Sequence, residues 1–87
     1  MKIKILFFAS IREVFDCHEK IVDIKHDENL TPNVLIENFS ITEKGPWLTL
    51  LNKKKIVRVA INQTLVEWQS PLRDGDELAF LPPITGG

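Results

Sequence analysis

The sequence has one cysteine among 87 residues, Cys17, and no long uninterrupted run of apolar residues. A single cysteine excludes an internal disulfide and a cysteine-based metal site, so the composition suits a reducing compartment and predicts a cytoplasmic protein. A membrane-spanning helix needs about 20 consecutive apolar residues, and the sequence has no apolar run of that length. Residues 1–8 include two lysines and are not a convincing signal peptide, because they lack a long uninterrupted apolar stretch and a small-residue cleavage site.

An excess of charge of one sign is also missing, because 11 basic residues balance 12 acidic ones and the formal net charge is −1. Such a balance creates no field that attracts nucleic acid or an anionic membrane, and neither is expected as a partner. The only basic run, Lys53 to Lys55, is typical of a solvated turn. A basic patch would require Arg58 and further cations to converge on it.

The size and the apolar content indicate one small globular domain. Hydrophobic residues make up 44% of the chain, which exceeds the content of disordered segments. A domain of this length buries roughly 60–65% of its unfolded surface, so its stability alone is modest. A partner that covers apolar surface would therefore stabilise it.

Apolar periodicity predicts five strands and three helices. Strands are expected over residues 2–9, 20–26, 56–61, 64–66 and 76–81. Helices are expected over residues 10–16, from Thr31-Pro32 to the break at Gly45-Pro46, and over residues 47–51. Ser10 and Glu13 form a capping-box pattern at the first helix, and Pro32 suits the first turn of the second. Asn62-Gln63 is expected to be a tight connection between strands.

This order of elements is typical of the β-grasp (ubiquitin-like) plan, an α+β fold in which a mixed β-sheet packs against a helix. The first and last strands of that plan lie parallel at the centre of the sheet, and residues 3–9 and 78–81 are apolar enough for that place. The sequence therefore predicts a β-grasp domain over residues 1–81. Residues 82–87 are predicted to form an extended tail.

The tail ends in two glycines, and its terminal carboxylate is the candidate reactive group of the chain. Pro82 and Pro83 cannot donate hydrogen bonds to a sheet, so they should end the last strand and keep the following segment extended. Gly86 and Gly87 have no side chains and can enter a passage too narrow for a Cβ atom. The reactive group would then be the Gly87 carboxylate. The alternative is a loose end without function, since chain termini are commonly unordered.

A carboxylate becomes a good electrophile only after activation, for example by adenylation with ATP. A sulfur donor could then displace AMP and leave a thiocarboxylate. The chain has no glycine-rich phosphate loop, so a partner enzyme would have to bind ATP and this chain is expected to bind no cofactor. No nucleophile–base arrangement or carboxylate pair predicts catalysis by this chain alone.

No metal site is expected either. His18 and His26 have no third ligand at a motif spacing. Asp74 and Asp76 flank Gly75, which indicates a turn with glycine at positive φ rather than a cation-binding loop. Cys17 could hold sulfur as a persulfide, but a lone cysteine near a helix end is more often a small apolar residue.

Three stretches of the sequence are similar to the MoaD-type small subunit of molybdopterin synthase, in the ThiS/MoaD ubiquitin-like family. They are residues 2–13 (KIKILFFASIRE), 59–66 (VAINQTLV) and, most specifically, 71–87 (PLRDGDELAFLPPITGG). The resemblance implies that a MoeB-type adenylyltransferase adenylates Gly87. Sulfur from a cysteine desulfurase or rhodanese system would then give a thiocarboxylate. Its sulfur would pass to cyclic pyranopterin monophosphate (precursor Z) and form the dithiolene of the molybdenum cofactor.

The resemblance also implies a MoaE-type large subunit as partner, in a heterotetramer of two small and two large chains whose catalytic side chains belong to the partners. Residues implied to insert into the large subunit are Pro82, Pro83, Ile84, Thr85 and Gly86. Phe80 and Leu81 are implied to contact it. Many members have an aromatic residue where this chain has Leu81, which is apolar but smaller.

Two alternatives stay open. A carrier for thiamine synthesis or transfer-RNA thiolation would use the same chemistry at Gly87, whereas a non-catalytic ubiquitin-like binding module would use a sheet face and no chemistry at its end. Trp68, which follows a short strand, could either fill the core or contribute to an exposed interface patch.

Overall fold

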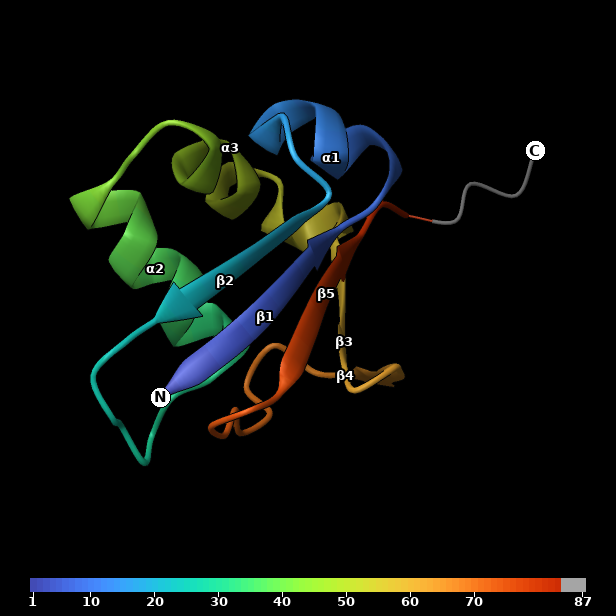
Figure 1. The fold of residues 1–87 in the computed structure, drawn as a ribbon. Helices are drawn as coiled ribbons and strands as arrows, with labels where there is room; N and C mark the ends of the chain where they lie inside the picture. The colour runs from blue at the N-terminus through green and yellow to red at the C-terminus, as the bar shows by residue number, and fades with distance from the viewer. Residues whose placement is uncertain (84–87) are drawn as a thin grey trace.

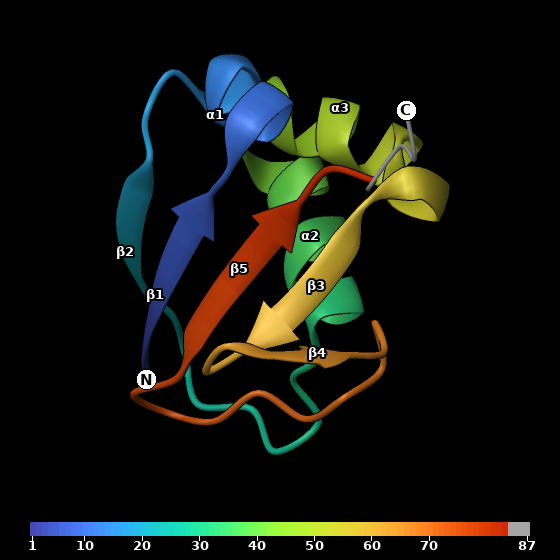
Figure 2. The ribbon, with the colours of Figure 1, turned by 90° about the vertical axis from the view of Figure 1, so that its right-hand side faces the viewer.

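The computed structural model describes residues 1–83, which form one mixed sheet with helices packed against one of its faces (Figures 1 and 2). The strands are β1 (Lys2–Phe7), β2 (Glu19–Asp23), β3 (Arg58–Ile61), β4 (Thr64–Val66) and β5 (Glu77–Leu81). The helices are α1 (Ala9–Phe15), α2 (Pro32–Thr42) and α3 (Pro46–Asn52), followed by the 3₁₀ turn η1 (Lys54–Ile56).

The sheet has the strand order β2-β1-β5-β3-β4. β1 and β5 pair in parallel at its centre, with Ile5 opposite Leu78, and the other neighbouring strands pair antiparallel. This arrangement confirms the predicted β-grasp plan and the central place of the first and last strands. The C-terminal strand is therefore held between two neighbours.

The core lies between the sheet and the helices. Alternate residues of the central strands point into it, because successive side chains in a strand face opposite sides. Its fully buried side chains include Ile3, Ile5, Phe7, Leu35, Ile36, Val59, Leu78 and Phe80. Trp47 of α3 joins them at 2% exposure and lies within 6.4 Å of Phe80, centroid to centroid.

The predicted start of α2 is confirmed. The Thr31 side chain accepts a hydrogen bond from the Val34 N–H at 3.1 Å, which satisfies one of the free donors at the helix start, and Pro32 occupies the first turn. The prediction for α1 is wrong in detail. Ser10 lies inside the helix, and the N-cap residue is Phe8, whose side chain makes no capping bond.

The first strand ends two residues before its predicted end, which explains the early start of α1. The Phe8 N–H still donates to the Phe80 carbonyl at 3.3 Å, but Ala9 adopts a left-handed backbone conformation with φ of 48°. This reversal takes the chain away from the sheet before Ser10. A capping box at Ser10 is therefore excluded by the geometry of the preceding residue.

Three other strands differ from prediction at their ends. β5 begins at Glu77, one residue after its predicted start, and β2 and β3 are shorter than predicted because their partners end. β2 stops at Asp23, opposite Lys2, so no strand remains to pair with residues 25–26. β3 begins at Arg58, opposite Leu81, which is the last residue of β5. Residues 54–56, before it, form η1 instead.

Candidate functional site

The tail leaves the domain at the end of the central strand. β5 ends at Leu81, immediately before Pro82 and Pro83, as the missing N–H groups of the two prolines predict. Figure 1 shows that β1 and β5 end side by side, close to α1. Pro82 is half-buried and Pro83 is exposed. The predicted roles of Ile84, Thr85, Gly86 and Gly87 fall outside the described residues and stay predictions.

The opposite end of β5 is fixed by the Asp74-Gly75-Asp76 turn. The Asp74 carboxylate accepts from the Lys2 N–H at 2.6 Å, and the Gly75 N–H donates to the Lys2 carbonyl at 2.8 Å. Gly75 has a φ of 85°, a conformation that side chains disfavour. These contacts confirm the predicted turn and join the start of β5 to the start of β1.

Asn62 links the same turn to the β3–β4 hairpin. Its side-chain amide donates to Asp76 at 3.0 Å, and its side-chain oxygen accepts from the Glu77 N–H at 3.0 Å. Asn62 and Gln63 have φ values of 50° and 70°, typical of a tight hairpin turn, so the predicted connection is confirmed. Residues 59–66 and 71–87, two of the three stretches that carry the family resemblance, therefore bind each other and set the position of β5.

Removing the Asp76 carboxylate is expected to destabilise the domain. Asp76→Ala loses the acceptors for the Arg73 N–H and the Asn62 amide, which should lower the free energy of unfolding by about 1–2 kcal/mol. Urea denaturation measures this change. Asp23→Ala is the control, because Asp23 is exposed and makes only a 3.7 Å contact with the N-terminal ammonium group. Equal stability of the two variants would contradict the role assigned to Asp76.

The sheet face turned away from the helices carries an apolar stripe that leads toward the tail. Cross-strand pairing places Leu6 beside Ala79, Ala79 beside Ala60, and Ala60 beside Leu65, which spans β1, β5, β3 and β4. Leu65 is 57% exposed. Leu81 follows two residues after Ala79, so it lies on this same open sheet face and is half-buried.

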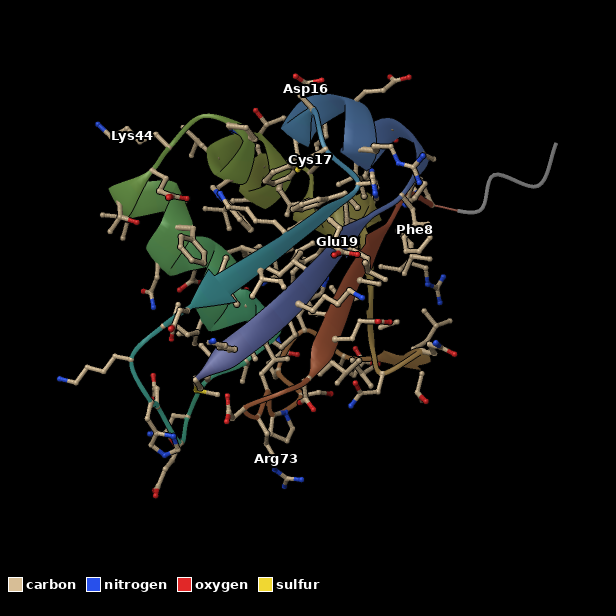
Figure 3. All side chains as sticks on the ribbon, viewed as in Figure 1. Phe8, Asp16, Cys17, Glu19, Lys44 and Arg73 are labelled. Carbon is tan, nitrogen blue, oxygen red and sulfur yellow. The ribbon has the colours of Figure 1, made fainter. Side chains whose placement is uncertain are left out.

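Phe80 lies on the other face of β5, which corrects the prediction that it contacts a partner. Its side chain is fully buried, and its ring centroid lies 6.2 Å from that of Phe7 and 5.9 Å from that of Trp68. The inward direction of residue 80 fixes the outward direction of residue 81. Leu81 is thus left as the candidate contact, next to Phe8, which is 38% exposed and lies near the root of the tail (Figure 3).

Phe8 was not among the predicted site residues. The sequence contained a signal for it, because Phe7 and Phe8 are adjacent and both cannot point into the core from one strand. A large apolar side chain beside Leu81 enlarges the surface that a partner could cover. The open sheet face therefore gathers residues from both central strands.

Trp68 both fills the core and keeps an exposed side. Its half-buried ring stacks on Phe80, and the Lys54 ammonium lies 5.6 Å from the ring centroid. Cys17 is half-buried and packs against the core, as a small apolar residue would. Within residues 1–83, no three His, Cys, Asp or Glu side chains gather closely enough to hold a metal ion. No helix of that part of the chain has the length and apolarity to cross a membrane.

Comparisons with known proteins agree with this geometry. The family model described as the ThiS family matches residues 5–87. The chain is 40% identical to the molybdopterin synthase sulfur carrier subunit of Escherichia coli K12, covering 98% of this chain and 99% of that protein. It is 38% identical to the corresponding subunit of Haemophilus influenzae, again covering 98% and 99%.

Solved structures show the same fold. A complex of subunits 1 and 2 of the molybdopterin-converting factor from Helicobacter pylori contains a chain that is 25% identical, with a TM-score of 0.63 and complete coverage of both chains. SAMP1 from Haloferax volcanii has a TM-score of 0.71 at 22% identity, also with complete coverage, and supports the fold alone.

Proposed function

Because the chain belongs to the ThiS family, we propose that it is the sulfur carrier subunit of molybdopterin synthase and that the Gly87 carboxylate carries the sulfur. The observation that carries this proposal is the 40% identity, over nearly the whole length of both proteins, to a sulfur carrier subunit of that synthase. The family model also extends to Gly87, so the match includes the reactive end.

The chemistry begins with activation of the terminal carboxylate. A MoeB-type adenylyltransferase binds ATP, joins AMP to a Gly87 oxygen and releases pyrophosphate. The outer sulfur of a persulfide on a cysteine desulfurase or rhodanese attacks the acyl carbon and AMP leaves, which produces an acyl disulfide. A thiol reductant then attacks the inner sulfur of this disulfide, so that the thiocarboxylate is released and the reductant and the donor enzyme form a disulfide. The thiocarboxylate sulfur is a soft nucleophile that attacks precursor Z in the large subunit. Hydrolysis of the new acyl–sulfur bond returns the Gly87 carboxylate, and two such transfers complete the dithiolene.

The described residues contribute position rather than catalysis. β5 is paired on both sides, and the side chains of Leu78 and Phe80 are fully buried, so the strand that leads to the tail is firmly held. The two prolines then separate the sheet from the reacting end. A carrier of this kind has to present its end to at least two enzymes in turn, and a fixed root supports that task.

The large-subunit partner is proposed to cover the open sheet face at Leu81 and Phe8. Exposed apolar side chains next to the tail would be buried as the tail enters the partner. The Helicobacter pylori structure, described as a complex of subunits 1 and 2, supports a partner of this type. We further propose the heterotetramer of two small and two large chains.

Mass spectrometry of the intact chain tests the proposal. Incubation with a MoeB-type enzyme, ATP and sulfide should add about 16 Da, because one oxygen is replaced by sulfur. The product should then convert precursor Z to molybdopterin when the large subunit is added. No mass gain with an enzyme that is active on its own carrier would refute the sulfur-carrier assignment. A mass gain without molybdopterin would instead favour thiamine synthesis or transfer-RNA thiolation.

A further inference from the structure

A second surface feature lies beside the root of the tail. A groove of about 1080 Å³ runs between the segment that joins α3 to β3 and the segment that follows β4, and Pro83 forms part of its wall. β4 ends at Val66, opposite Val59, while β3 extends further to Arg58. The groove therefore occupies the side of β3 that β4 leaves uncovered. Figure 2 shows β4 beside the end of β3, away from the point at which β5 ends.

The floor of the groove is apolar. Buried Val57 and Val59 and half-buried Val66 line it, together with the ring of Trp68. Leu65 belongs to this groove as well as to the stripe on the open sheet face. A partner that covers the open sheet face can thus continue into the groove past Leu65, and also past Arg58, which lies opposite Leu81.

The walls are cationic, although the whole chain has a net charge of −1. Residues 44–66 contain five cations and no aspartate or glutamate, which is the strongest separation of charge in the sequence. Lys54, Lys55 and Arg58 from this stretch all line the groove, where Glu67 is the only acidic residue. Lys54 and Lys55 therefore do converge with Arg58, as a functional basic patch requires, whereas Lys53 does not line the groove.

Lys54 is held at this surface by contacts with two other elements. Its ammonium group donates to the Asn33 side-chain oxygen of α2 and lies over the Trp68 ring. Lys55 and Arg58 are exposed and have no ion-pair partner within residues 1–83. Two unpaired cations beside an apolar floor can bind carboxylates that alternate with apolar side chains.

We propose that this groove binds an extended acidic segment of the large subunit that receives the tail. The inference rests on the proposed function and adds a second contact to the one at Leu81. A protein segment suits the groove better than nucleic acid, because aliphatic side chains line the groove together with the cations. The Trp68 ring is also already contacted by Phe80 and Lys54 rather than open for base stacking.

Charge reversal in the groove tests the proposal. Lys55→Glu/Arg58→Glu should weaken binding of the large subunit about thirtyfold to a hundredfold at about 50 mM salt and remove most of the salt dependence. Lys54 is left unchanged because its contacts are structural. The control is Lys25→Glu/Lys44→Glu, which changes the net charge equally at exposed sites outside the groove. Lys44 lies far from the tail (Figure 3), and the control should change affinity by less than about threefold.

A carbodiimide, which joins an ammonium group directly to a carboxylate in contact with it, provides a second measurement. In the complex of the two subunits it should link Lys55 to an aspartate or glutamate of the large subunit, and peptide mass spectrometry should identify that segment. Unchanged affinity in the groove variant, or equal losses in groove and control variants, would refute the proposal while leaving the mass gain at Gly87 intact. The proposal would also be refuted if the native chain and the control variant bound an RNA oligonucleotide and the groove variant did not. Failure of the native chain to bind the large subunit would refute the proposed function itself.

Discussion

Adding one alanine after Gly87 is expected to abolish thiocarboxylate formation and to stop molybdopterin synthesis. The extension moves the carboxylate by up to about 3.5 Å, the length of one extended residue. It also places a Cβ atom next to the reacting carbon, where Gly87 has none. A displacement of about 1 Å at a reacting centre can cost a hundredfold in rate, so a loss of at least that size is expected.

Intact mass and product formation measure this effect. The extended chain should gain no sulfur under conditions that convert the native chain completely. Its stability should change little, because residues 1–83 and the contacts among them remain the same. Deletion of Gly87 is a second variant with the same expected loss. Full sulfur transfer by the extended chain would contradict the role of the terminal carboxylate and favour a non-catalytic binding module.

Most of the fold could be predicted because its local signals are unambiguous. The alternation from Lys2 to Phe7 defines the faces of β1, Thr31-Pro32 marks the start of α2, and the Asn62-Gln63 pair has the backbone tolerance that a tight turn needs. Each signal depends on neighbours within a few residues. The order of the elements then leaves few topologies, and the β-grasp plan is one of them.

The predictions that failed depend on distant residues or on the family resemblance. Ser10 has the sequence of a cap, but the chain leaves the sheet at the left-handed Ala9, directly after the Phe8–Phe80 backbone bond, at a position that no local pattern specifies. Alternation from Glu77 places Leu78 and Phe80 on one face of the last strand, and this face is the core. The expected partner contact of Phe80 came from the family resemblance and not from that pattern. The convergence of Arg58 with two of the lysines depends on where β4 ends.

Phe80 and Leu81 are adjacent in sequence, and their replacement is expected to have opposite consequences. Phe80→Ala removes a fully buried ring that contacts Phe7, Trp47 and Trp68, which should cost about 3–5 kcal/mol. Because a domain of this size has a total stability of roughly 4–13 kcal/mol, this variant should unfold at much lower urea concentrations. Leu81→Asp changes a half-buried side chain on the open sheet face and should cost less than about 1.5 kcal/mol.

For binding of the large subunit we expect the reverse: among the folded proteins, Leu81→Asp should lose more affinity than Phe80→Ala. A carboxylate at position 81 would lose the apolar contact and would have to be desolvated against the large subunit, although Arg58 on the neighbouring strand lies opposite it, so Leu81→Asp should weaken binding by about tenfold to a hundredfold. Calorimetric titration with the large subunit measures this loss. Leu65→Asp on the same face is a useful comparison: its position farther along the stripe, at 57% exposure, predicts a smaller loss. Native affinity in Leu81→Asp would exclude the open sheet face as the interface, and the burial of Phe80 would then leave the tail and the cationic groove as the remaining contacts.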